Sequence, residues 1–235
     1  MNIAIIPARG GSKRIPRKNI KLFDGKPMIA YAINAAEASG LFEHIVVSTE
    51  DEEIAAIARE WGAETPFARP AELANDYTAT VPVIAHGIKA CRALGWKFER
   101  VCCIYPAVPL IQVDDLVGSL TRLIDSGADY CFPVTTFPSP VQRALRQRDD
   151  GTMHPFYPQH EIERSQDLEL AYHDAGQFYW GRTEAWLSNA RIHSGGVGYV
   201  IPRWRVVDID TDEDWVRAEK LSKFATLVKI KHLPQ

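Results

Sequence analysis

The chain has 235 residues, of which 46% are hydrophobic, and its formal net charge is −3. This length and composition allow a full hydrophobic core and favour one domain that carries a sizeable insertion. The weakly acidic balance gives no reason to expect a nucleic-acid or membrane partner, and no apolar run approaches the ~20 residues of a membrane-spanning helix.

The N-terminus and the cysteines indicate the compartment. The first apolar stretch is too short for a signal peptide and precedes the positive charges. The four cysteines show no C-x-x-C spacing, and Cys102 and Cys103 lie in an apolar run that is typical of a buried strand. We therefore expect a cytoplasmic protein whose reduced cysteines pack as small hydrophobic side chains.

The first elements alternate between short apolar runs and helical patterns. Residues 3–6 are continuously apolar, as in a strand that is buried on both faces of a parallel sheet. Further strands are predicted at 44–49, 100–105 and 129–134. Helices are predicted at 27–39, 51–61, 78–94 and 113–126. This alternation predicts an α/β fold with a mostly parallel central sheet flanked by helices.

Residues 138–174 interrupt this alternation, because they are rich in Pro, Gln, Arg and His and lack clear periodicity. We interpret them as an insertion with extended pieces at 144–148 and 153–158 that serves as a lid, a dimerisation arm or both. The alternation then resumes. The later predicted elements are a strand at 177–180, a helix at 184–189, a strand at 197–201, an acidic stretch at 208–212 and a last helix at 213–225.

The loop after the first strand reads A-R-G-G-S-K-R-I-P-R-K-N at residues 8–19. Ligands of open α/β sheets bind at the carboxyl ends of strands, where this loop lies. Gly10 and Gly11 allow a sharp turn whose N–H groups can hold an anion, and the cations beside them suit phosphate. Neither a P-loop string nor a dinucleotide fingerprint occurs, and a solvated basic loop is the alternative.

The stretch from Ala8 to Lys13, followed by Lys18 and Asn19, resembles the signature loop of the CMP-sugar synthetases. These enzymes are cytidylyltransferases within the GT-A-like nucleotidyltransferases. Three further stretches resemble the family in the same order: V-V-S-T-E-D at 46–51, R-P-A-E-L-A-N-D at 69–76 and D-I-D-T at 208–211. The resemblance covers essentially the whole chain. It implies one Rossmann-like nucleotidyltransferase domain over residues 1–235, with the insertion as the arm of a homodimer.

The resemblance also implies the chemistry. The anomeric hydroxyl of a nonulosonic acid attacks the α-phosphorus of CTP, and pyrophosphate leaves. Lys13, Arg9 and Asp210 are the expected catalytic residues, with Lys13 stabilising the transition state. The expected nucleotide-binding residues are Ala8, Arg9, Gly10, Gly11, Ser12, Lys13, Lys18, Asn19, Arg69, Asp76 and Thr78.

Some of these residues have plainer interpretations. Arg69 precedes a proline, so an extended backbone is expected there; the family uses this segment to recognise cytosine, and the alternative is a surface arginine. Asp76 and Thr78 precede a predicted helix. They fit a contact with the ribose, and they fit capping of that helix equally well.

Asp208 and Asp210 are the predicted ligands of Mg²⁺ or Mn²⁺. On an extended chain their carboxylates share a face, and Mg²⁺ prefers one or two carboxylates together with substrate phosphates. The D-x-D spacing alone is weak evidence, so the assignment rests on the resemblance. Capping of the last helix by Thr211 or Asp212 would be compatible with it.

The part that faces the sugar departs from the sialic acid synthetases. Tyr105 and Ile111 stand where those enzymes carry glutamine and arginine, and His173 stands where they carry an arginine. The strings at 165–168 and 171–180 resemble the branch that acts on pseudaminic acid. The expected sugar-binding residues are Tyr105, Arg143, Tyr172, His173 and Gln177. A structural role for His173 and core packing for Tyr172 are the alternatives.

The sequence therefore predicts an enzyme that makes CMP-pseudaminic acid from CTP for a bacterial surface glycan. The nearest alternative is a CMP-sialic acid or CMP-legionaminic acid synthetase, or a synthetase for another keto-sugar acid. A GT-A glycosyltransferase and a non-catalytic nucleotide-binding regulator are more distant alternatives. The basic loop suits a free triphosphate, which argues against a glycosyltransferase.

Overall fold

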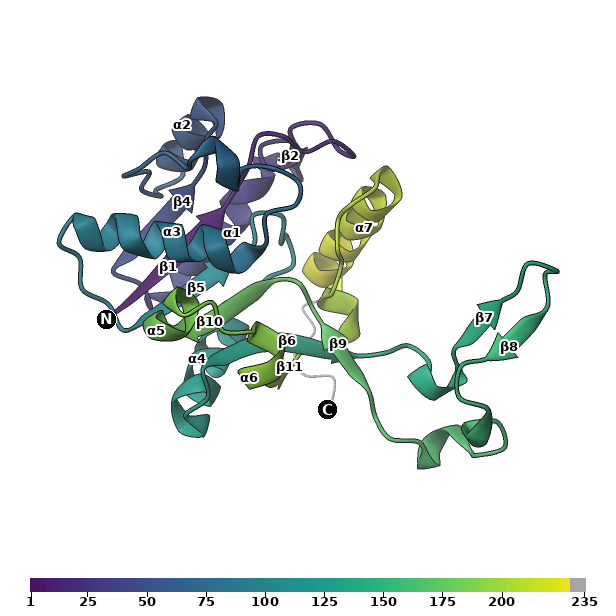
Figure 1. Ribbon diagram of the computed structural model, residues 1–235. Helices are drawn as coiled ribbons and strands as arrows, with labels where there is room; N and C mark the ends of the chain where they lie inside the picture. Colours follow the sequence, from purple (N-terminus) through teal and green to yellow (C-terminus); the bar gives the residue numbers. More distant parts are fainter. Residues whose placement is uncertain (229–235) are drawn as a thin grey trace.

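The computed structural model describes the backbone of residues 1–228 and contains a central sheet with the strand order β11-β6-β10-β5-β1-β4 (Figure 1). These strands are β1 (Asn2–Pro7), β4 (His44–Ser48), β5 (Arg100–Ile104), β6 (Tyr130–Thr136), β10 (Phe178–Arg182) and β11 (Gly196–Val200). β1 is parallel to β4 and β5, and β11 is parallel to β6. β10 runs antiparallel to both of its neighbours. The predicted α/β fold with a mostly parallel sheet is confirmed.

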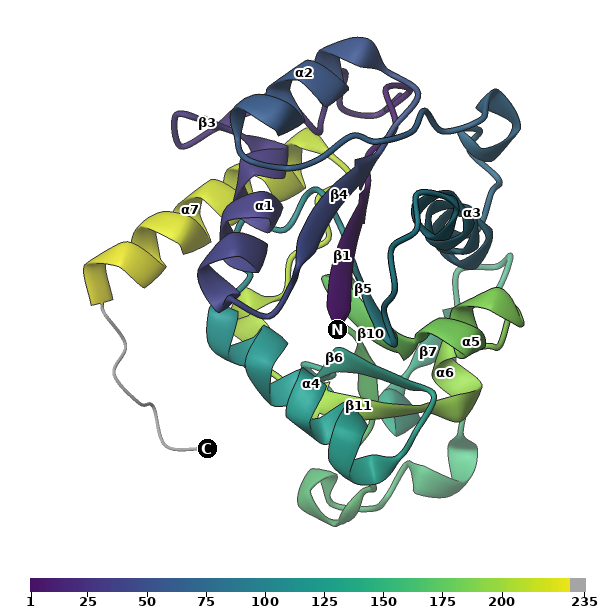
Figure 2. The ribbon, with the colours of Figure 1, turned by 90° about the vertical axis from the view of Figure 1, so that its left-hand side faces the viewer.

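Helices cover both faces of this sheet, so its central strands are buried on both sides (Figure 2). Ala4 and Ile6 of β1 pack in a cluster with α1 (Met28–Ser39), α2 (Glu52–Glu60) and α4 (Val113–Ser126). Ile3 and Ile5 point to the other face, toward α3 (Thr80–Ala93) and α5 (Thr183–Leu187). The continuously apolar run at residues 3–6 has this cause, because alternate side chains enter two different cores.

The helices begin and end close to the positions that the sequence predicts. α1 follows Pro27 and ends before Gly40, whose φ of 63° requires the left-handed conformation that glycine favours. α2 starts one residue later than predicted, because Asp51 is its N-cap and accepts a hydrogen bond from the N–H of Ile54 over 3.0 Å. α3 begins at Thr80 rather than at residue 78. Within the described residues, no helix is both long and apolar enough to span a membrane.

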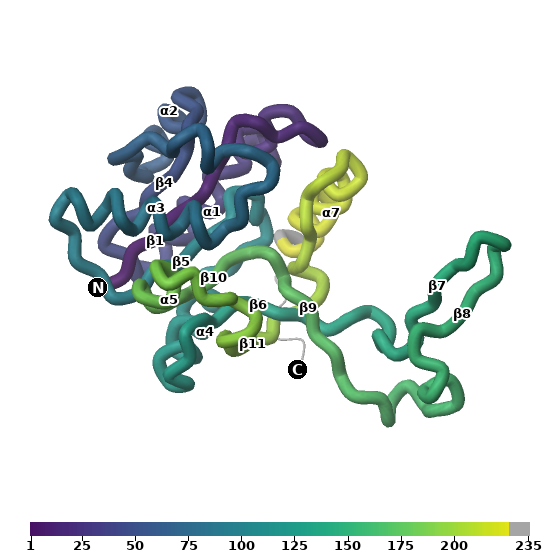
Figure 3. The backbone as a smooth tube through the Cα atoms, viewed as in Figure 1, coloured from purple at the N-terminus to yellow at the C-terminus, as the bar shows by residue number. Residues whose placement is uncertain are grey.

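The segment at 138–174 extends away from the sheet as an arm (Figure 3). It contains the antiparallel pair β7 (Leu145–Gln147) and β8 (Met153–Pro155), which confirms the two predicted extended pieces. Its last residues form β9 (Tyr172–Asp174), which pairs with β6 and was not predicted as a strand. β9 therefore anchors the end of the arm to the sheet.

A third hydrophobic cluster packs residues that follow β1 against residues in and just before the last helix. It contains Ile15 of the basic loop, Phe23 of the hairpin β2 (Leu22–Phe23) and β3 (Lys26–Pro27), Met28 of α1, and Ile209 and Trp215. Trp215 belongs to α7 (Asp212–Val228), and a further short helix, α6 (Ile192–Gly195), precedes β11. The hairpin and α6 were not predicted. The cluster places the acidic stretch at 208–212 beside the loop at 8–19.

Candidate active site

The first half of the basic loop is shaped by the segment that follows β4. The N–H of Gly10 donates a hydrogen bond to the Glu50 carboxylate over 2.7 Å. A Cβ atom at position 10 would lie 2.4 Å from Oδ2 of Asp51, whereas nothing lies within 4 Å of a Cβ at Gly11. Gly10 is therefore required by a close approach of the backbone to Asp51, and Gly11 is under no such constraint.

The second half of the loop is tied to the same region. Arg17 adopts a φ of 55°, and its guanidinium pairs with the carboxylates of Asp51 and Glu53. The buried side chain of Asn19 donates to the carbonyl oxygen of Arg9 over 2.9 Å. Asn19 thus closes the loop by joining its end to its beginning.

The loop forms one wall of a cleft of about 510 Å³. The fold brings most of the predicted nucleotide residues to this cleft, together with one predicted sugar residue and one predicted metal ligand. The predicted residues that line it are Arg9, Ser12, Lys13, Lys18, Asn19, Arg69, Asp76, Thr78, Tyr105 and Asp210. Ala8, Gly10 and Gly11 are not part of the lining; Ala8 is buried and bonded to Ser48, so these three shape the backbone.

Two cations of the loop share one carboxylate across the cleft. Nη1 of Arg9 lies 2.5 Å from Oδ1 of Asp76, and Nζ of Lys13 lies 2.5 Å from Oδ2 of the same residue. Hydrogen bonds from Lys13 and Arg9 lower the pKa of the Asp76 carboxyl. Asp76 is therefore an anion that already occupies the donors that the sequence assigns to phosphate.

The acidic stretch faces the same loop, because Ile209 is buried in the third cluster. Nζ of Lys18 donates to the carbonyl oxygen of Ile209 over 2.7 Å and lies 3.4 Å from Oδ1 of Asp210. Arg14 contacts Oδ2 of Asp210 over 2.9 Å. Partial desolvation and the charge of Asp210 raise the pKa of Asp208. Two carboxylates that repel each other so close to a cleft are a donor set that suits a divalent cation.

The donor set also limits how such a cation would be held. Among the described residues, no three His, Cys, Asp or Glu side chains come together in the way a complete protein cage requires. Mg²⁺ commonly uses one or two carboxylates and takes its other ligands from water and substrate phosphates. Asp208 and Asp210 fit that pattern. Asp210 lines the cleft and Asp208 does not.

Capping of α7 uses neighbouring residues and involves neither the Asp208 nor the Asp210 carboxylate. The Thr211 hydroxyl accepts a hydrogen bond from the N–H of Asp214 over 3.2 Å. The Asp214 carboxylate accepts in return from the N–H and the hydroxyl of Thr211, over 2.9 and 2.7 Å. This is a reciprocal capping box. It confirms Thr211 as the cap, and Asp212 makes a distant ion pair with Lys21 over 3.9 Å.

Arg69 is a buried cation at the edge of the cleft. It is 5% exposed, and its guanidinium donates to the carbonyl oxygen and the hydroxyl of Ser48. The backbone N–H of Arg69 donates to the carbonyl oxygen of Thr49 over 2.9 Å. Burial lowers the pKa of Arg69. The residue is therefore fixed against the end of β4, and the alternative of a surface arginine is wrong.

Tyr105 marks the other end of the cleft and belongs to a network of hydrogen bonds. Its hydroxyl lies 2.9 Å from Oγ1 of Thr80, and its ring is 5.3 Å from that of Tyr179. The hydroxyl of Tyr179 donates to Oδ2 of Asp174 over 2.9 Å, and this oxygen also contacts Nε2 of His193 over 2.6 Å. Burial raises the pKa of Tyr105 and of Tyr179.

The sequence did not single out Asp174 or His193 as parts of the site. Pairing of β9 with β6 and of β10 with β5 brings Asp174 and Tyr179 behind Tyr105, while α6 supplies His193. This network depends on long-range strand pairing. A local signal for it is the single aspartate within the string H-D-A-G-Q-F-Y at 173–179.

The other predicted sugar residues lie outside the cleft lining. Arg143 is exposed in the arm and donates to the carbonyl oxygen of Glu163. Tyr172 is 45% exposed on β9. Nδ1 of His173 lies 2.9 Å from the carbonyl oxygen of Asp174, and the buried Gln177 donates to the carbonyl oxygen of Arg205 over 2.7 Å. Their contact with a sugar stays a prediction.

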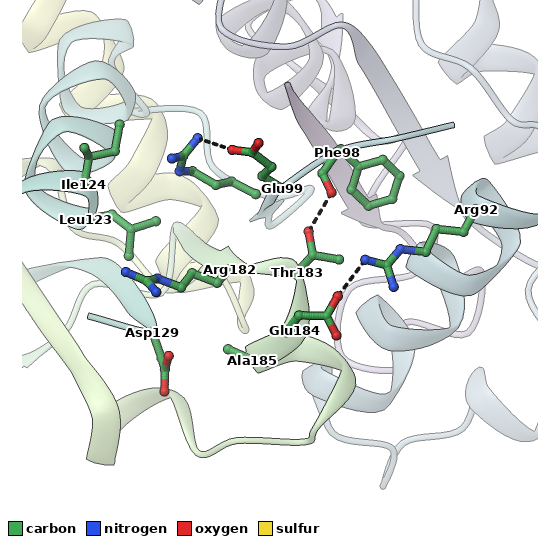
Figure 4. Close-up of a pocket in the computed structure, with 11 residues that line it drawn as sticks. Arg92, Phe98, Glu99, Leu123, Ile124, Asp129, Arg182, Thr183, Glu184 and Ala185 are labelled. Carbon is green, nitrogen blue, oxygen red and sulfur yellow. Dashed lines mark hydrogen bonds and ion pairs between the residues drawn. The ribbon is translucent and has the colours of Figure 1, made fainter. Parts of the chain in front are cut away.

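A second cavity of about 620 Å³ lies where β5 begins and β10 ends, at the ends of these strands that are far from Tyr105 (Figure 4). Its basic and acidic side chains are equal in number and partly paired with each other, as in Arg92 with Glu184 over 2.7 Å and Arg100 with Glu99 over 3.4 Å. None of the predicted site residues lines it. The cleft at the basic loop is therefore the candidate active site.

Comparison with known proteins identifies the family of the chain. The sequence profile of the cytidylyltransferase family matches residues 3–201. The chain is 42% identical over 225 residues to a pseudaminic acid cytidylyltransferase of Campylobacter jejuni, a match that covers 94% of this chain and 96% of the relative. It is 29% identical over 227 residues to a CMP-N,N'-diacetyllegionaminic acid synthase of Legionella pneumophila, covering 93% of this chain and 95% of the relative.

Solved structures extend the likeness to the fold. A CMP:2-keto-3-deoxy-manno-octonic acid synthetase complexed with CTP superimposes with a TM-score of 0.67 at 15% identity. The superposition covers 95% of this chain and 98% of that structure. A 4-diphosphocytidyl-2C-methyl-D-erythritol synthase from Anaerococcus prevotii gives a TM-score of 0.62 at 12% identity, with 94% and 98% covered. The nucleotidyltransferase fold expected from the sequence is confirmed.

Proposed function

Because this chain belongs to the cytidylyltransferase family, we propose that it transfers CMP from CTP to pseudaminic acid and releases pyrophosphate. The observation that carries the proposal is the cleft in which the basic loop from the N-terminus meets Asp210 from the C-terminus. A triphosphate needs cations and a place for a metal ion on opposite sides, and this cleft supplies both. The 42% identity to a pseudaminic acid cytidylyltransferase supports the choice of sugar.

The nucleotide binds along the loop. Arg9, Ser12 and Lys13 contact the phosphates, and Lys18 and Asn19 contact phosphate or nucleotide from the same loop. Arg69 lines the cleft, where its hydrogen bonds to Ser48 hold the guanidinium rigidly enough to recognise the cytosine ring. A buried arginine with a fixed guanidinium gives such recognition at little cost in side-chain entropy.

A divalent cation, Mg²⁺ or Mn²⁺, is held by Asp210 and Asp208. When bound, it offsets negative charge on the phosphates. The carboxylate of Asp210 already contacts Arg14 and Lys18, so these two residues position it beside the cleft. The chain itself thus keeps the acidic side of the site close to its basic side.

The reaction is a displacement at phosphorus. The anomeric hydroxyl of the sugar loses its proton to water as it attacks the α-phosphorus, the bond from the α-phosphorus to the bridging oxygen of the β-phosphate breaks, and pyrophosphate leaves with the electron pair. Lys13 and Arg9 stabilise the charge that develops on the phosphate oxygens. Positioning of the two substrates against each other supplies the rest of the acceleration.

Tyr105 lies at the sugar end of the cleft. It replaces a glutamine of the sialic acid enzymes, and its ring packs on Tyr179, so this end is less polar than an amide would make it. Such a surface suits a deoxygenated sugar acid better than one with a glycerol tail. The alternative substrates are sialic and legionaminic acid, because a legionaminic acid enzyme also aligns with the chain.

The arm completes the enzyme as a homodimer. Its apolar side chains at Leu145, Met153 and Phe156 are more than half exposed in the single chain. A second copy would cover them and would bring Arg143 of one arm toward the sugar site of the other. The four cysteines are free and buried, which suits the reducing cytoplasm.

A panel of sugar acids with CTP and Mg²⁺, read out as pyrophosphate release, tests the proposal. We expect turnover with pseudaminic acid at least about 10-fold above that with sialic or legionaminic acid, equivalent to about 1.4 kcal/mol of discrimination. Preferred turnover of sialic acid would replace the proposed substrate. Binding of a UDP-sugar without CTP turnover would favour a glycosyltransferase instead.

Replacement of Lys13 by Met gives the matched test of the catalytic assignment. The side chain keeps its length and loses its charge, so we expect kcat to fall by roughly 10²- to 10³-fold, as for removal of other donors to a developing oxyanion. Lys97→Met is the control, because Lys97 is exposed and lies outside the cleft lining. Equal activity of the two variants would remove Lys13 from the catalytic set.

A further inference from the structure

Asp76 neutralises two cations of the phosphate-binding loop with a single carboxylate. Each of its oxygens lies 2.5 Å from a different cation, Arg9 in one case and Lys13 in the other. Carboxylate and phosphate oxygens use the same nitrogen donors of lysine and arginine. A phosphate group that binds the same two nitrogen atoms therefore competes with Asp76 for them.

Asp76 can leave these cations without disturbing the core. It lies between a short 3-10 helix at Ala71–Leu73 and α3, in a segment whose hydrogen bonds are local. The side chain of Asn75 accepts from the N–H groups of Tyr77 and Thr78 over 2.8 and 2.9 Å. Tyr77 is 95% exposed. The turn around Asn75 keeps its shape whether or not Asp76 contacts the loop.

Asp210 also pairs with cations of the loop, but its position is different. It is fixed beside the buried Ile209, and Arg14 and Lys18 are its partners. Arg9 and Lys13, on the same loop, pair with Asp76 instead. Asp76 therefore competes with a phosphate, whereas Asp210 faces the site from the acidic stretch.

We propose that Asp76 is an internal competitor of the phosphates, which keeps pyrophosphate from binding tightly and returns to Arg9 and Lys13 as pyrophosphate leaves. This inference rests on the proposed CTP-dependent reaction. Asp76 carries one negative charge, while CTP and pyrophosphate each carry several, so Asp76 weakens the binding of both without blocking either. Exposed ion pairs are weak and screened by salt, so CTP displaces Asp76 and binds with a reduced affinity.

Titration calorimetry with inorganic pyrophosphate tests this, without a divalent cation so that no metal-bound pyrophosphate contributes. For Asp76→Asn, which keeps the shape of the side chain and removes its charge, we expect pyrophosphate to bind about 3- to 10-fold more tightly, the size of one or two exposed ion pairs. The gain should shrink as salt is added. Binding of cytidine, which has no phosphate, should stay within about twofold of the wild type.

Two variants serve as controls. Asp76→Glu restores the charge and should bind pyrophosphate as the wild type does. Glu72→Gln removes an exposed carboxylate from the preceding 3-10 helix and should leave pyrophosphate binding unchanged. Unchanged or weaker binding of pyrophosphate by Asp76→Asn would overturn the inference. A wild-type protein that neither turns over CTP nor binds it would overturn the proposed function, while the pyrophosphate titration would still report on Asp76.

Discussion

At the scale of single residues, the shape of the basic loop at 8–19 depends on a position that has no room for a side chain. A methyl group at Gly10 would lie 2.4 Å from Oδ2 of Asp51, which also caps α2 and pairs with Arg17. For Gly10→Ala we expect the free energy of unfolding to fall by about 1–3 kcal/mol, the usual effect of overpacking. A shift of the loop by about 1 Å should lower kcat/KM by roughly 10²-fold. Chemical denaturation and steady-state kinetics measure the two effects.

Gly11→Ala is the matched control for this prediction. The added Cβ atom would meet nothing within 4 Å, and Gly11 does not have a positive φ. We expect the equilibrium constant for unfolding and kcat/KM of Gly11→Ala to stay within about twofold of the wild type, as for most exposed substitutions. Equal damage from both substitutions would mean that the contact with Asp51 does not set the shape of the loop.

At the scale of elements, Asp51 joins the basic loop to the first turn of α2. The hydrogen bond from Arg17 lowers the pKa of Asp51 to about 2. A carboxyl whose pKa is lower in the folded chain stabilises the fold at pH values above its unfolded pKa of roughly 4, and this contribution is lost as the pH falls toward 2. At neutral pH the shift corresponds to about 2 kcal/mol.

Comparison of the wild type with Asp51→Asn isolates this contribution. We expect the difference in their free energies of unfolding to be about 2 kcal/mol near pH 6 and to shrink progressively between about pH 4 and pH 2. Asp125→Asn, an exposed aspartate on α4, is the control whose difference from the wild type should stay small throughout. A difference for Asp51→Asn that did not vary with pH would contradict the role of its charge.

The elements that the sequence predicted well are those whose signals are local. α1 and α4 each end at a glycine with a positive φ, and β1 is apolar because both of its faces are buried. The hairpin of β2 and β3 turns at Asp24 and Gly25, an Asp-Gly pair with positive φ angles, and such a pair is a local hairpin signal. β9 is only three residues long and pairs with the end of β6 that β10 does not reach, a long-range contact that no local pattern indicates.

The candidate site likewise contains residues with a local sequence signal and residues that only long-range contacts bring together. Residues of the loop at 8–19 could be assigned to phosphate because their glycines and cations are adjacent in sequence. The contact of Asp76 with Arg9 spans 67 residues, and that of Lys18 with Asp210 spans 192. Such pairs follow from the strand order and from the burial of Ile209 in the third cluster. The network of Tyr105, Tyr179 and Asp174 likewise needs the antiparallel β10 beside β5.

At the scale of the whole molecule, the arm is a part whose apolar side chains are exposed to solvent in a single chain. Residues 145 and 147 of β7 face the same side as their partners 155 and 153 of β8, so Leu145 and Met153 form an apolar face. Each is 57% exposed. Burial of this face in a dimer would contribute roughly 25 cal/mol for each Å² of apolar surface.

Sedimentation velocity of the wild type and of Met153→Asp tests whether a second copy covers that face. We expect the wild type to sediment as a dimer and Met153→Asp to dissociate at least about 10-fold more readily, because an unpaired charge would be buried in the interface. Asp149→Asn, at the exposed tip of the same hairpin, should leave the dimer intact. If the arm also covers the sugar site of the partner, Met153→Asp should raise KM for the sugar and leave CTP affinity unchanged. A wild type that sediments as a monomer would show that the arm has another purpose.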